Sequence, residues 1–424
     1  MSNVEKTAIG LLPTNWEVRR IKDVCDTTSG GTPSRSKAAY YDLGTIPWIK
    51  TGELRHKYIF ETEEKITEVA LQQSSAKLVP KNSVLMAMYG ATIGKTSINK
   101  IEATTNQACC AMISKGKLEP EFLYYVLSSN KDKIVALSAG GAQPNISQQI
   151  IREIEIPFPP QEEQQKIVSI LTSVDEAIEK TEAIIEQTEK VKKGLMQQLF
   201  TKGIGHTKFK KTEIGEVPEE WEVLKVQDIA LKVTDGEHKT PNRTTFGELL
   251  LSARNVKNNM LDLSNVDYVS QEELEKITKR CNPEEGDILI SCSGTVGRVC
   301  VVPKGIKFGL VRSVALVKSD KGTANSNFLM YVLQSHKLQE QMRMNQSQLA
   351  QANLFLRDIN ALKIPFPSLK EQEKIAGIIG SLDLKLTAET RKIEKLSKIK
   401  KGLMQSLLTG KVRVKADETE VTQV

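Results

Sequence analysis

The sequence predicts an α+β protein made of two similar mixed α/β modules, each followed by one long helix. The first observation is an internal repeat, since residues 154–201 align without a gap to residues 362–409 and 22 of the 48 positions are identical. The second is a stripe of apolar residues at helical spacing in both aligned segments. The third is a set of short β-branched runs, such as residues 83–89 and 287–291, which are typical of strands. Two copies are too few for a solenoid and indicate a duplicated module with pseudo-twofold symmetry.

The mixed parts of the two modules share landmarks outside the aligned helices. Residues 9–18, with the pattern Ile-Gly-x-x-Pro-x-x-Trp-Glu-Val, recur as residues 214–223. Segments 121–129 and 327–335 both have the apolar spacing of a helix. Each mixed part ends in the tetrapeptide Ile-Pro-Phe-Pro, and its prolines stop whatever element precedes them.

The two long helices are predicted to pair as a coiled coil. Apolar residues recur in alternating steps of three and four, which gives a heptad-like seam of six turns or more in each copy. Gly194 and Gly402 are expected to interrupt the helices, and Gly203 and Gly410 to end them. The seam consists of Ile167, Leu171, Val174, Ile178, Ile185, Val191, Leu195, Leu199, Ile375, Ile379, Leu382, Leu386, Ile393, Leu396, Ile399, Leu403 and Leu407.

Charge and length support the pairing of these helices. Residues 161–203 carry eight acidic and six basic side chains, whereas residues 368–411 carry five acidic and ten basic ones. Opposite net charges favour association without setting its direction. A helix of about 42 residues extends about 63 Å, which exceeds the diameter of a small domain. The alternative, that each helix only covers the core of its own module, accounts less well for this length.

These observations divide the chain into five segments. Two mixed domains are expected at residues 1–157 and 204–365, and two spacer helices at residues 158–203 and 366–411. Residues 412–424 form a tail.

The composition excludes several classes of protein. The 424 residues include 59 Lys and Arg against 52 Asp and Glu, a net charge of +7 that permits a polyanionic partner without requiring one. Nowhere do 18 uncharged apolar residues occur in a row, so no membrane span is expected. The six cysteines show no paired framework, which fits free or buried thiols and a cytoplasmic location. Only four histidines are present, so a zinc site is not expected.

No catalytic motif is complete. The run Gly90 to Lys95 approaches a phosphate-binding loop, but that loop needs four residues between its glycines and only three intervene here. The alternative is a glycine turn between two strands, repeated at Gly294 and Gly297. The acidic cluster Glu61, Glu63 and Glu64 is expected to be a solvated turn rather than a metal site. The chain is therefore predicted to be non-catalytic by itself.

Two diverged modules on a rigid spacer are suited to reading two short signals at a fixed distance, and double-stranded DNA supplies such signals. Basic and polar side chains gather near the glycine and proline turns, where they could hold phosphates or base edges. The predicted DNA-binding residues are Arg35, Lys37, Lys50, Arg55, Lys57, Tyr89 and Lys95 in the first module, and His238, Lys239, Arg243, Arg254, Asn255, Lys257, Arg298 and Arg312 in the second.

Several motifs resemble the specificity subunit of type I restriction-modification systems. The openings of both modules are similar to those of its target-recognition domains, in the runs 29–34, 46–49 and 235–241. The segment Gln143-Pro144-Asn145-Ile146-Ser147, followed by residues 156–167, resembles the family's junction into its central helix. The resemblance covers roughly residues 7–412, and the order of parts also agrees.

The resemblance implies antiparallel packing of the two helices and one recognition domain over each half of a bipartite, asymmetric DNA sequence. It also implies that methyltransferase subunits, usually two, dock on the chain and that restriction and translocase subunits join that core. No cofactor is then expected in this chain, because S-adenosylmethionine, ATP and Mg²⁺ belong to the partner subunits.

The second module departs from the family pattern in places. It has Ala352 where the first has Pro144, and residues 249–252 replace the Ile-Pro-Trp-Ile run. These departures suggest that the two half-sites differ in sequence.

Two other classes of function compete with this reading. One is a DNA-modifying enzyme with a diverged methyltransferase or nuclease site. The other is a coiled-coil scaffold with no nucleic-acid role, which the repeated Gln-x-Asn landmarks disfavour.

Overall fold

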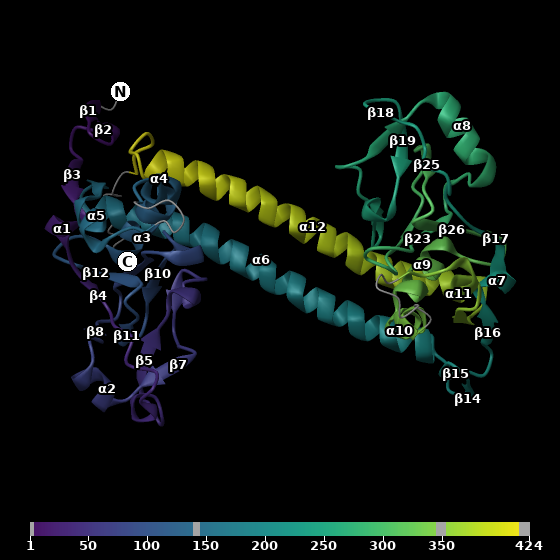
Figure 1. Ribbon diagram of the computed structural model, residues 1–424, viewed down its shortest axis with the longest axis horizontal. Coiled ribbons are helices and arrows are strands. Elements are labelled where there is room, and N and C mark those ends of the chain that lie inside the picture. The colour runs from purple at the N-terminus through teal and green to yellow at the C-terminus, as the bar shows by residue number, and fades with distance from the viewer. Residues whose placement is uncertain (1–3, 139–144, 345–352, 415–424) are drawn as a thin grey trace, which may run out of the picture. The chain divides into compact units, whose positions relative to one another are not determined.

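The computed structural model describes residues 4–138, 145–344 and 353–414, and Figure 1 follows the chain by colour. Its contacts divide the chain into two compact units. Unit 1 comprises residues 1–181 and 392–424, and unit 2 comprises residues 182–391. Each unit therefore holds one mixed module, the N-terminal part of one long helix and the C-terminal part of the other.

Unit 1 is built on a five-stranded sheet in the order β4-β12-β9-β10-β6 and a four-stranded sheet in the order β7-β5-β11-β8. Two ladders, β1-β2 and β13-β3, complete it. The central strand β9 is buried along its whole length, which explains why its sequence Val-Leu-Met-Ala lacks polar alternation. The strands are β1 (Val4–Thr7), β2 (Gly10–Pro13), β3 (Glu17–Arg20), β4 (Cys25–Ser29), β5 (Ile46–Ile49), β6 (Tyr58–Ile59), β7 (Glu64–Ile66), β8 (Leu78–Val79), β9 (Val84–Ala87), β10 (Thr96–Asn99), β11 (Ala103–Thr105), β12 (Cys109–Ser114) and β13 (Glu155–Phe158).

Unit 2 repeats this plan with a four-stranded sheet in the order β17-β26-β23-β24 and a second in the order β18-β22-β19-β25. Three ladders, β14-β15, β16-β27 and β20-β21, accompany them. The orders show that β17, β26, β23 and β24 correspond to β4, β12, β9 and β10. The strands are β14 (Phe209–Thr212), β15 (Gly215–Pro218), β16 (Glu222–Lys225), β17 (Ala230–Asp235), β18 (Arg243–Thr244), β19 (Glu248–Leu251), β20 (Val256–Lys257), β21 (Met260–Leu261), β22 (Asp267–Val269), β23 (Ile288–Ser291), β24 (Val299–Val301), β25 (Phe308–Leu310), β26 (Val314–Ser319) and β27 (Lys363–Phe366).

Short helices pack on these sheets, and one long helix follows each module. The predicted architecture of two mixed α/β modules with a long helix after each is thereby confirmed. The short helices are α1 (Ile21–Val24), α2 (Glu68–Gln73), α3 (Pro120–Ser129), α4 (Lys131–Ala136), α5 (Gln148–Glu153), α7 (Val226–Ile229), α8 (Gln271–Arg280), α9 (Ser326–Gln334), α10 (His336–Met344) and α11 (Leu356–Asn360), with 3-10 turns η1 (Ala38–Tyr40), η2 (Thr51–Glu53), η3 (Gly90–Thr92) and η4 (Ala253–Asn255). The long helices are α6 (Gln161–Lys202) and α12 (Leu369–Leu407).

The long helices differ from expectation at two glycines. The prediction that Gly194 and Gly402 interrupt them was wrong, because α6 and α12 are continuous through both positions. A glycine inside a helix costs about 1 kcal/mol relative to alanine, which the packing of a long helix can offset. Gly203 adopts a positive φ of 62° directly after α6, and Gly410 one of 67° shortly after α12. These glycines allow the left-handed turn that follows a helix end.

The two helices are antiparallel within each unit. In unit 1 Lys400 of α12 forms an ion pair of 2.5 Å with Asp175 of α6. In unit 2 Lys192 of α6 forms an ion pair of 2.5 Å with Asp383 of α12. The N-terminal part of one helix thus lies beside the C-terminal part of the other in both units (Figure 1).

A buried glutamine joins each long helix to its module. The Gln164 side chain accepts from the Glu119 N–H and donates to the carbonyls of Pro159 and Lys117. The Gln372 side chain makes the same three bonds, with Asn325, Pro367 and Thr323. Both glutamines are fully buried.

A tryptophan and a glutamate add a second link at the start of each helix. Trp16 Nε1 donates to Glu163 at 2.9 Å, and Trp221 Nε1 donates to Glu371 at 3.0 Å. The first glutamate also binds Arg413 and the second His206.

Candidate nucleic-acid interface

Three segments meet at one edge of each mixed module. The first is the end of β4 or β17, which continues into a glycine packed against a neighbouring carbonyl. A Cβ atom on Gly30 would lie 1.8 Å from the Thr105 carbonyl oxygen, and one on Gly236 would lie 2.2 Å from that of Leu310. Only glycine, which has no Cβ atom, lets the backbone come this close to the carbonyl. Gly30 therefore packs against the end of β11, and Gly236 packs against the end of β25.

The other two segments also repeat. The link from β11 to β12 spans residues 106–108, and the link from β25 to β26 spans residues 311–313. The residue that follows β9 or β23 by two positions then bridges to an asparagine, in the pairs Tyr89 with Asn145 and Ser293 with Asn353. We call these three segments the frame. Of the junction motif, Gln143, Pro144, Gln351 and Ala352 lie outside the described residues.

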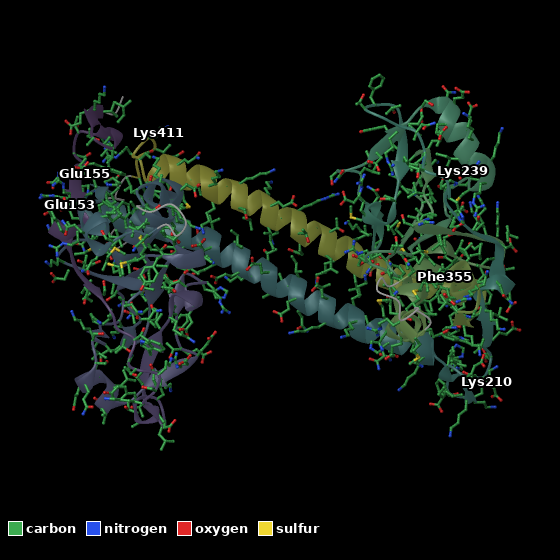
Figure 2. The ribbon with its side chains drawn as sticks, in the orientation of Figure 1. Glu153, Glu155, Lys210, Lys239, Phe355 and Lys411 are labelled. Carbon is green, nitrogen blue, oxygen red and sulfur yellow. The ribbon has the colours of Figure 1, made fainter. Side chains whose placement is uncertain are left out.

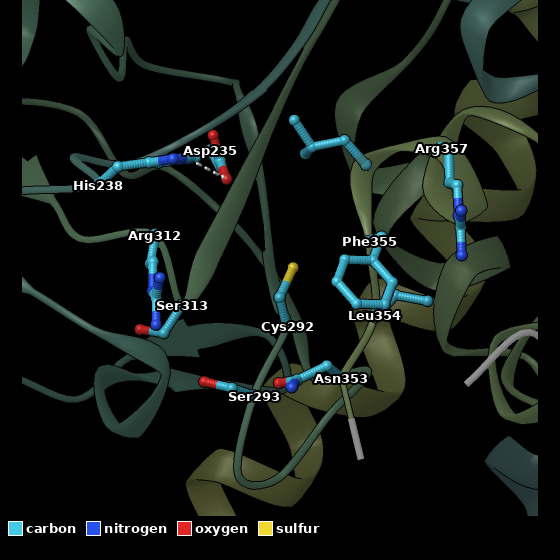
Figure 3. Close-up of a pocket in the computed structure, with 11 residues that line it drawn as sticks. Asp235, His238, Cys292, Ser293, Arg312, Ser313, Asn353, Leu354, Phe355 and Arg357 are labelled. Atoms are coloured by element: carbon cyan, nitrogen blue, oxygen red, sulfur yellow. Dashed lines mark hydrogen bonds and ion pairs between the residues drawn. The ribbon is translucent and has the colours of Figure 1, made fainter. Parts of the chain in front are cut away.

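In unit 2 the frame surrounds a hollow of about 720 Å³. Figure 3 shows Asp235, His238 and Arg312 on one side of it, and Phe355 and Arg357 on the other. Asp235 holds His238 Nε2 at 2.8 Å and Arg280 Nη2 at 2.8 Å, and its carboxylate raises the pKa of Arg280. The Arg280 guanidinium neutralises the Asp235 charge inside the site. The hollow presents cationic and neutral donors, which suit the acceptors of a nucleic acid.

The same frame in unit 1 carries neutral side chains. Ser29, which occupies the place of Asp235, donates to Gln148 at 2.9 Å. The Thr32 hydroxyl donates to the Gln107 side-chain oxygen. Gln148 also donates to the Thr27 carbonyl at 2.9 Å. Hydroxyls and amides thus replace the charged groups of unit 2.

Four of the predicted DNA-binding bases are held by two carboxylates. Arg35 and Lys50 contact Glu64 at 2.6 and 2.7 Å, and their hydrogen bonds lower the pKa of Glu64 to about 2. The Glu64 carboxyl is therefore not part of a solvated turn, because it is the first residue of β7. Asp267, the first residue of β22, receives Arg254 at 2.8 Å and Arg243 at 3.2 Å. Burial would raise the pKa of Asp267, but the two arginines outweigh burial and lower it.

Two other predicted residues have structural positions. Lys57 is 8% exposed and donates to Tyr125 Oη at 2.7 Å, with Asp175 3.8 Å away. Asn255 is 1% exposed and its amide donates to the carbonyls of Asp262 and Asn265. Both residues stabilise their own unit, so we leave them out of the proposed interface.

Four of the remaining predicted residues have neighbours of their own. Lys37 donates to Tyr40 Oη at 3.0 Å, and Arg55 donates to the Gly52 carbonyl at 2.7 Å. Lys257 lies 3.7 Å from Asp262. Tyr89 is half-buried in the frame, beside Asn145.

Four of the predicted basic side chains have no hydrogen bond or ion pair with any described residue: Lys95, Lys239, Arg298 and Arg312. Lys95 and Arg298 directly precede β10 and β24, after glycines of positive φ, and so occupy equivalent positions. The run before each of them connects two antiparallel strands, which confirms the interpretation as a glycine turn. Lys239 extends from an exposed loop of unit 2, and Figure 2 labels it together with Phe355. Free cations at equivalent places are available to phosphates.

Sequence reasoning missed the polar residues that complete the frame. Gln107, Gln148 and Arg280 were not predicted, although each contacts a residue of the frame or lies in it. The signal that could have found Gln107 is its alignment with Arg312 at a spacing of 205 residues.

Residues 13–190 and 218–398 each match the family model described as the type I restriction modification DNA specificity domain. The chain belongs to this family. The two matches cover both modules and a large part of each long helix.

Similar proteins agree with the family. The chain is 31% identical to the MjaX type I restriction enzyme specificity subunit of Methanocaldococcus jannaschii, over 97% of each chain. It is 27% identical to the MjaVIII specificity subunit of the same organism, over 95% of this chain and 94% of the relative. The crystal structure of the S subunit from M. genitalium has the same fold, with a TM-score of 0.59, 20% identity, and coverage of 93% of this chain and 96% of that one.

The chain is thus a specificity subunit with two DNA specificity domains, a non-catalytic class of DNA-recognition subunit. The competing interpretation as a DNA-modifying enzyme finds no support in these relatives. Among the residues that the structure describes, no group of three or more His, Cys, Asp or Glu side chains is placed to hold a metal ion. No described helix is long and apolar enough to span a membrane.

The predicted seam of this specificity subunit is buried most deeply near the helix ends. Ile167, Leu171, Leu199, Ile375, Ile379 and Leu407 are buried in the cores of the two units. Val191 and Ile399 were expected to be covered, but they are 41% and 42% exposed. The next residue in each case, Lys192 or Lys400, turns toward the other helix for the ion pair, so the preceding side chain points elsewhere. The other seam residues, Val174, Ile178, Ile185, Leu195, Leu382, Leu386, Ile393, Leu396 and Leu403, are half-buried.

Proposed function

We propose that each unit binds one half of a bipartite, asymmetric DNA target. The observation that carries this proposal is the repeated frame, which has charged side chains in unit 2 and neutral ones in unit 1. A shared frame with different donors suits two modules that read different base sequences in the same manner. Hydrogen bonds to base edges supply sequence information, whereas contacts to phosphates position the protein.

The phosphate contacts are assigned to the free cations Lys95, Lys239 and Arg298. Their side chains are not neutralised by a described carboxylate, so they can displace counterions from the DNA backbone. Binding is therefore expected to weaken steeply as salt is raised. The basic residues held by Glu64 and Asp267 shape the surface rather than supply its free charge.

The helices are assigned the role of a spacer. In this proposal residues 1–157 and 204–365 are the recognition domains, residues 158–203 and 366–411 are the spacer helices, and residues 412–424 are a tail. The antiparallel ion pairs of α6 and α12 support a stiff pair of helices. A stiff spacer would set the number of unread base pairs between the half-sites.

The partners in this proposal are methyltransferase subunits, expected to number two, and restriction or translocase subunits that join through them. S-adenosylmethionine would bind the methyltransferase partner, and ATP with Mg²⁺ the restriction partner. A solved structure from a study of complex assembly in a type I R-M system has the same fold, with a TM-score of 0.58, 16% identity, and coverage of 95% of this chain and 99% of that one. The assembly would act in the cytoplasm, where it meets DNA.

Footprinting of the chain assembled with its methyltransferase subunits tests the proposal. Two protected patches are expected, with centres about one DNA turn, or about 34 Å, apart. Insertion of one heptad at matching points in α6 and α12 should lengthen the unprotected gap. One continuous footprint would contradict the bipartite assignment, and a gap unchanged by the insertion would contradict the spacer role.

A further inference from the structure

Gln107 and Arg312 occupy the same position in the two units. Each is the middle residue of the three-residue link between β11 and β12 or between β25 and β26. The last residue of each link accepts an equivalent backbone bond, from Met88 N–H to the Ala108 carbonyl and from Cys292 N–H to that of Ser313, both at 2.8 Å. The backbone, rather than sequence similarity, establishes this equivalence.

Both side chains belong to the frame and are exposed. Gln107 Oε1 accepts from the Thr32 hydroxyl, and Nε2 has no hydrogen-bond partner among the described residues. Arg312 lines the hollow next to His238, and its guanidinium has no partner in the part of the chain that the structure describes. The Thr32 bond occupies one lone pair of the Gln107 side-chain oxygen and leaves both N–H donors and the other lone pair free.

The free groups match different bases. A glutamine amide can donate to adenine N7 while accepting from adenine N6, whereas an arginine can donate twice to guanine, at O6 and N7. Arg312 lines the hollow together with Arg357 and the Asp235 carboxylate, whose charge Arg280 neutralises, and the planar guanidinium of Arg312 makes no bond to a described residue.

We propose that Gln107 and Arg312 are the equivalent specificity-determining residues of the two modules. Gln107 reads an adenine in the half-site of unit 1, and Arg312 reads a guanine in the half-site of unit 2. This inference rests on the proposed function, because it assigns one base to each half of a bipartite target.

Selection from randomised duplex DNA tests the assignment. The probe is a library of random-sequence duplexes, and the protein is the full-length chain purified with its methyltransferase subunits. The unsubstituted complex should enrich a two-part consensus. R312Q should lower the preference for guanine at one position of one half-site by roughly 5- to 150-fold, the range for one bidentate base contact, and leave the other half-site unchanged. Q107R should replace adenine by guanine at one position of the other half-site.

R312K separates base reading from phosphate binding. Lysine retains the positive charge but loses the planar fork, so guanine preference should fall while the salt dependence of binding stays the same. A consensus unchanged by both R312K and R312Q would identify a phosphate contact and overturn the assignment, because lysine can also donate to guanine whereas glutamine lacks the charge. The matched controls are K304Q, which removes an exposed charge between β24 and β25, and Q72R, which adds one on α2. Neither control should change the consensus.

The outcomes for the function and for the inference are distinct. Failure of the unsubstituted complex to enrich any bipartite sequence would refute the proposed function and the base assignment with it. A bipartite consensus that survives both R312Q and Q107R would refute the base assignment alone. A change in both half-sites from a single substitution would also refute it, since the two residues lie in separate units.

Discussion

The contacts that join each long helix to its module are the same in the two units, whereas the side chains that line the interface differ. Gln164 and Gln372 make the same three hydrogen bonds, and a tryptophan donates to a glutamate at the start of each helix. In the frame, by contrast, Ser29 stands where unit 2 has Asp235. The duplication has kept the contacts that hold the helix in place and varied the exposed edge.

The units also differ inside the shared scaffold. Asp175 binds Tyr125 Oη at 2.6 Å and Asp383 binds Tyr331 Oη at 2.6 Å, and each aspartate receives a lysine from the other helix. The third neighbour is a buried lysine, Lys57, in unit 1, but the neutral Asn259 in unit 2. Unit 1 therefore holds one more buried charge at this junction than unit 2 does.

The largest expected effect is the loss of Asp175. D175N should destabilise unit 1 by about 3–5 kcal/mol because it leaves Lys57 buried without its counter-ion. D383N should destabilise unit 2 less, by about 1–2 kcal/mol. The third neighbour of Asp383 is the neutral Asn259, so the substitution leaves no charge at that position without a counter-ion. Alkylation rates report each unit separately, since Cys25, Cys109 and Cys110 are buried in unit 1 and Cys281, Cys292 and Cys300 in unit 2. Equal costs for the two substitutions would contradict the comparison.

The cost of D175N should also depend on pH. Burial lowers the pKa of Lys57 in the folded protein, and Asp175 opposes that effect. A lysine whose folded pKa is below its unfolded value destabilises the fold at low pH, and the penalty disappears as pH rises toward 10.5. The effect of D175N should therefore shrink between neutral pH and pH 10.5. The double variant K57M/D175N should recover most of the loss at pH 7, and no recovery would show that Lys57 is not responsible.

The next effect concerns the buried glutamines, where the units should behave alike. Q164L and Q372L should each destabilise their own unit by about 2–3 kcal/mol, because a buried N–H and two carbonyls lose their partners. Thiol protection in each unit gives the two values. Q165L offers a control for unit 1, since Gln165 is exposed and binds only the surface residue Glu119. A difference of several kcal/mol between Q164L and Q372L would mean that the same three hydrogen bonds stabilise the two units to different extents.

The repeat made the architecture predictable. The two copies, identical at 22 of 48 positions, carry the same stripe of apolar residues. The spacing of these residues predicts a helix from the local sequence alone, whatever segments pack against it. Gly203 also marked the end of α6, because its effect on the backbone is local. The expectation that the prolines stop the preceding element was wrong for Pro157 and Pro365, which lie inside the short strands β13 and β27. Gly194 and Gly402 misled the prediction, since tertiary packing outweighs the helix propensity of one residue.

The candidate interface was less predictable because it depends on contacts between distant segments. Arg35 and Lys50 are held by Glu64 across 29 and 14 residues, so their pairing follows from the position of β7 and not from local sequence. Lys57 and Asn255 had suitable side chains, but burial removes them from the surface. Gln107 was not predicted to bind DNA, because a single glutamine in a short link between strands forms no recognisable motif.

The smallest expected effect distinguishes the two carboxylates that hold basic residues. Arg35 and Lys50 lower the pKa of Glu64 to about 2, from a value of 4.5, so this pair stabilises unit 1 above pH 4.5 and loses its effect as pH falls toward 2. The gain should be about 0.5–1 kcal/mol, the scale of a partly exposed ion pair. E64Q should abolish that acid dependence near β7, and D267N should do the same near β22 to a smaller extent.

Hydrogen-exchange mass spectrometry at pH 5, 4 and 3 can follow peptides from β7 and β22 in one sample. Acidification should open the β7 region of the unsubstituted protein more than the β22 region. Burial is the largest influence on the pKa of Asp267 and opposes its two arginines, whereas the hydrogen bonds from Arg35 and Lys50 are the largest influences on the pKa of Glu64. In E64Q the β7 region should lose less protection on acidification, while β22 stays as before. If β22 proved the more acid-sensitive strand, the arginine pair on Asp267 would be the stronger of the two, and the ranking of the units would reverse.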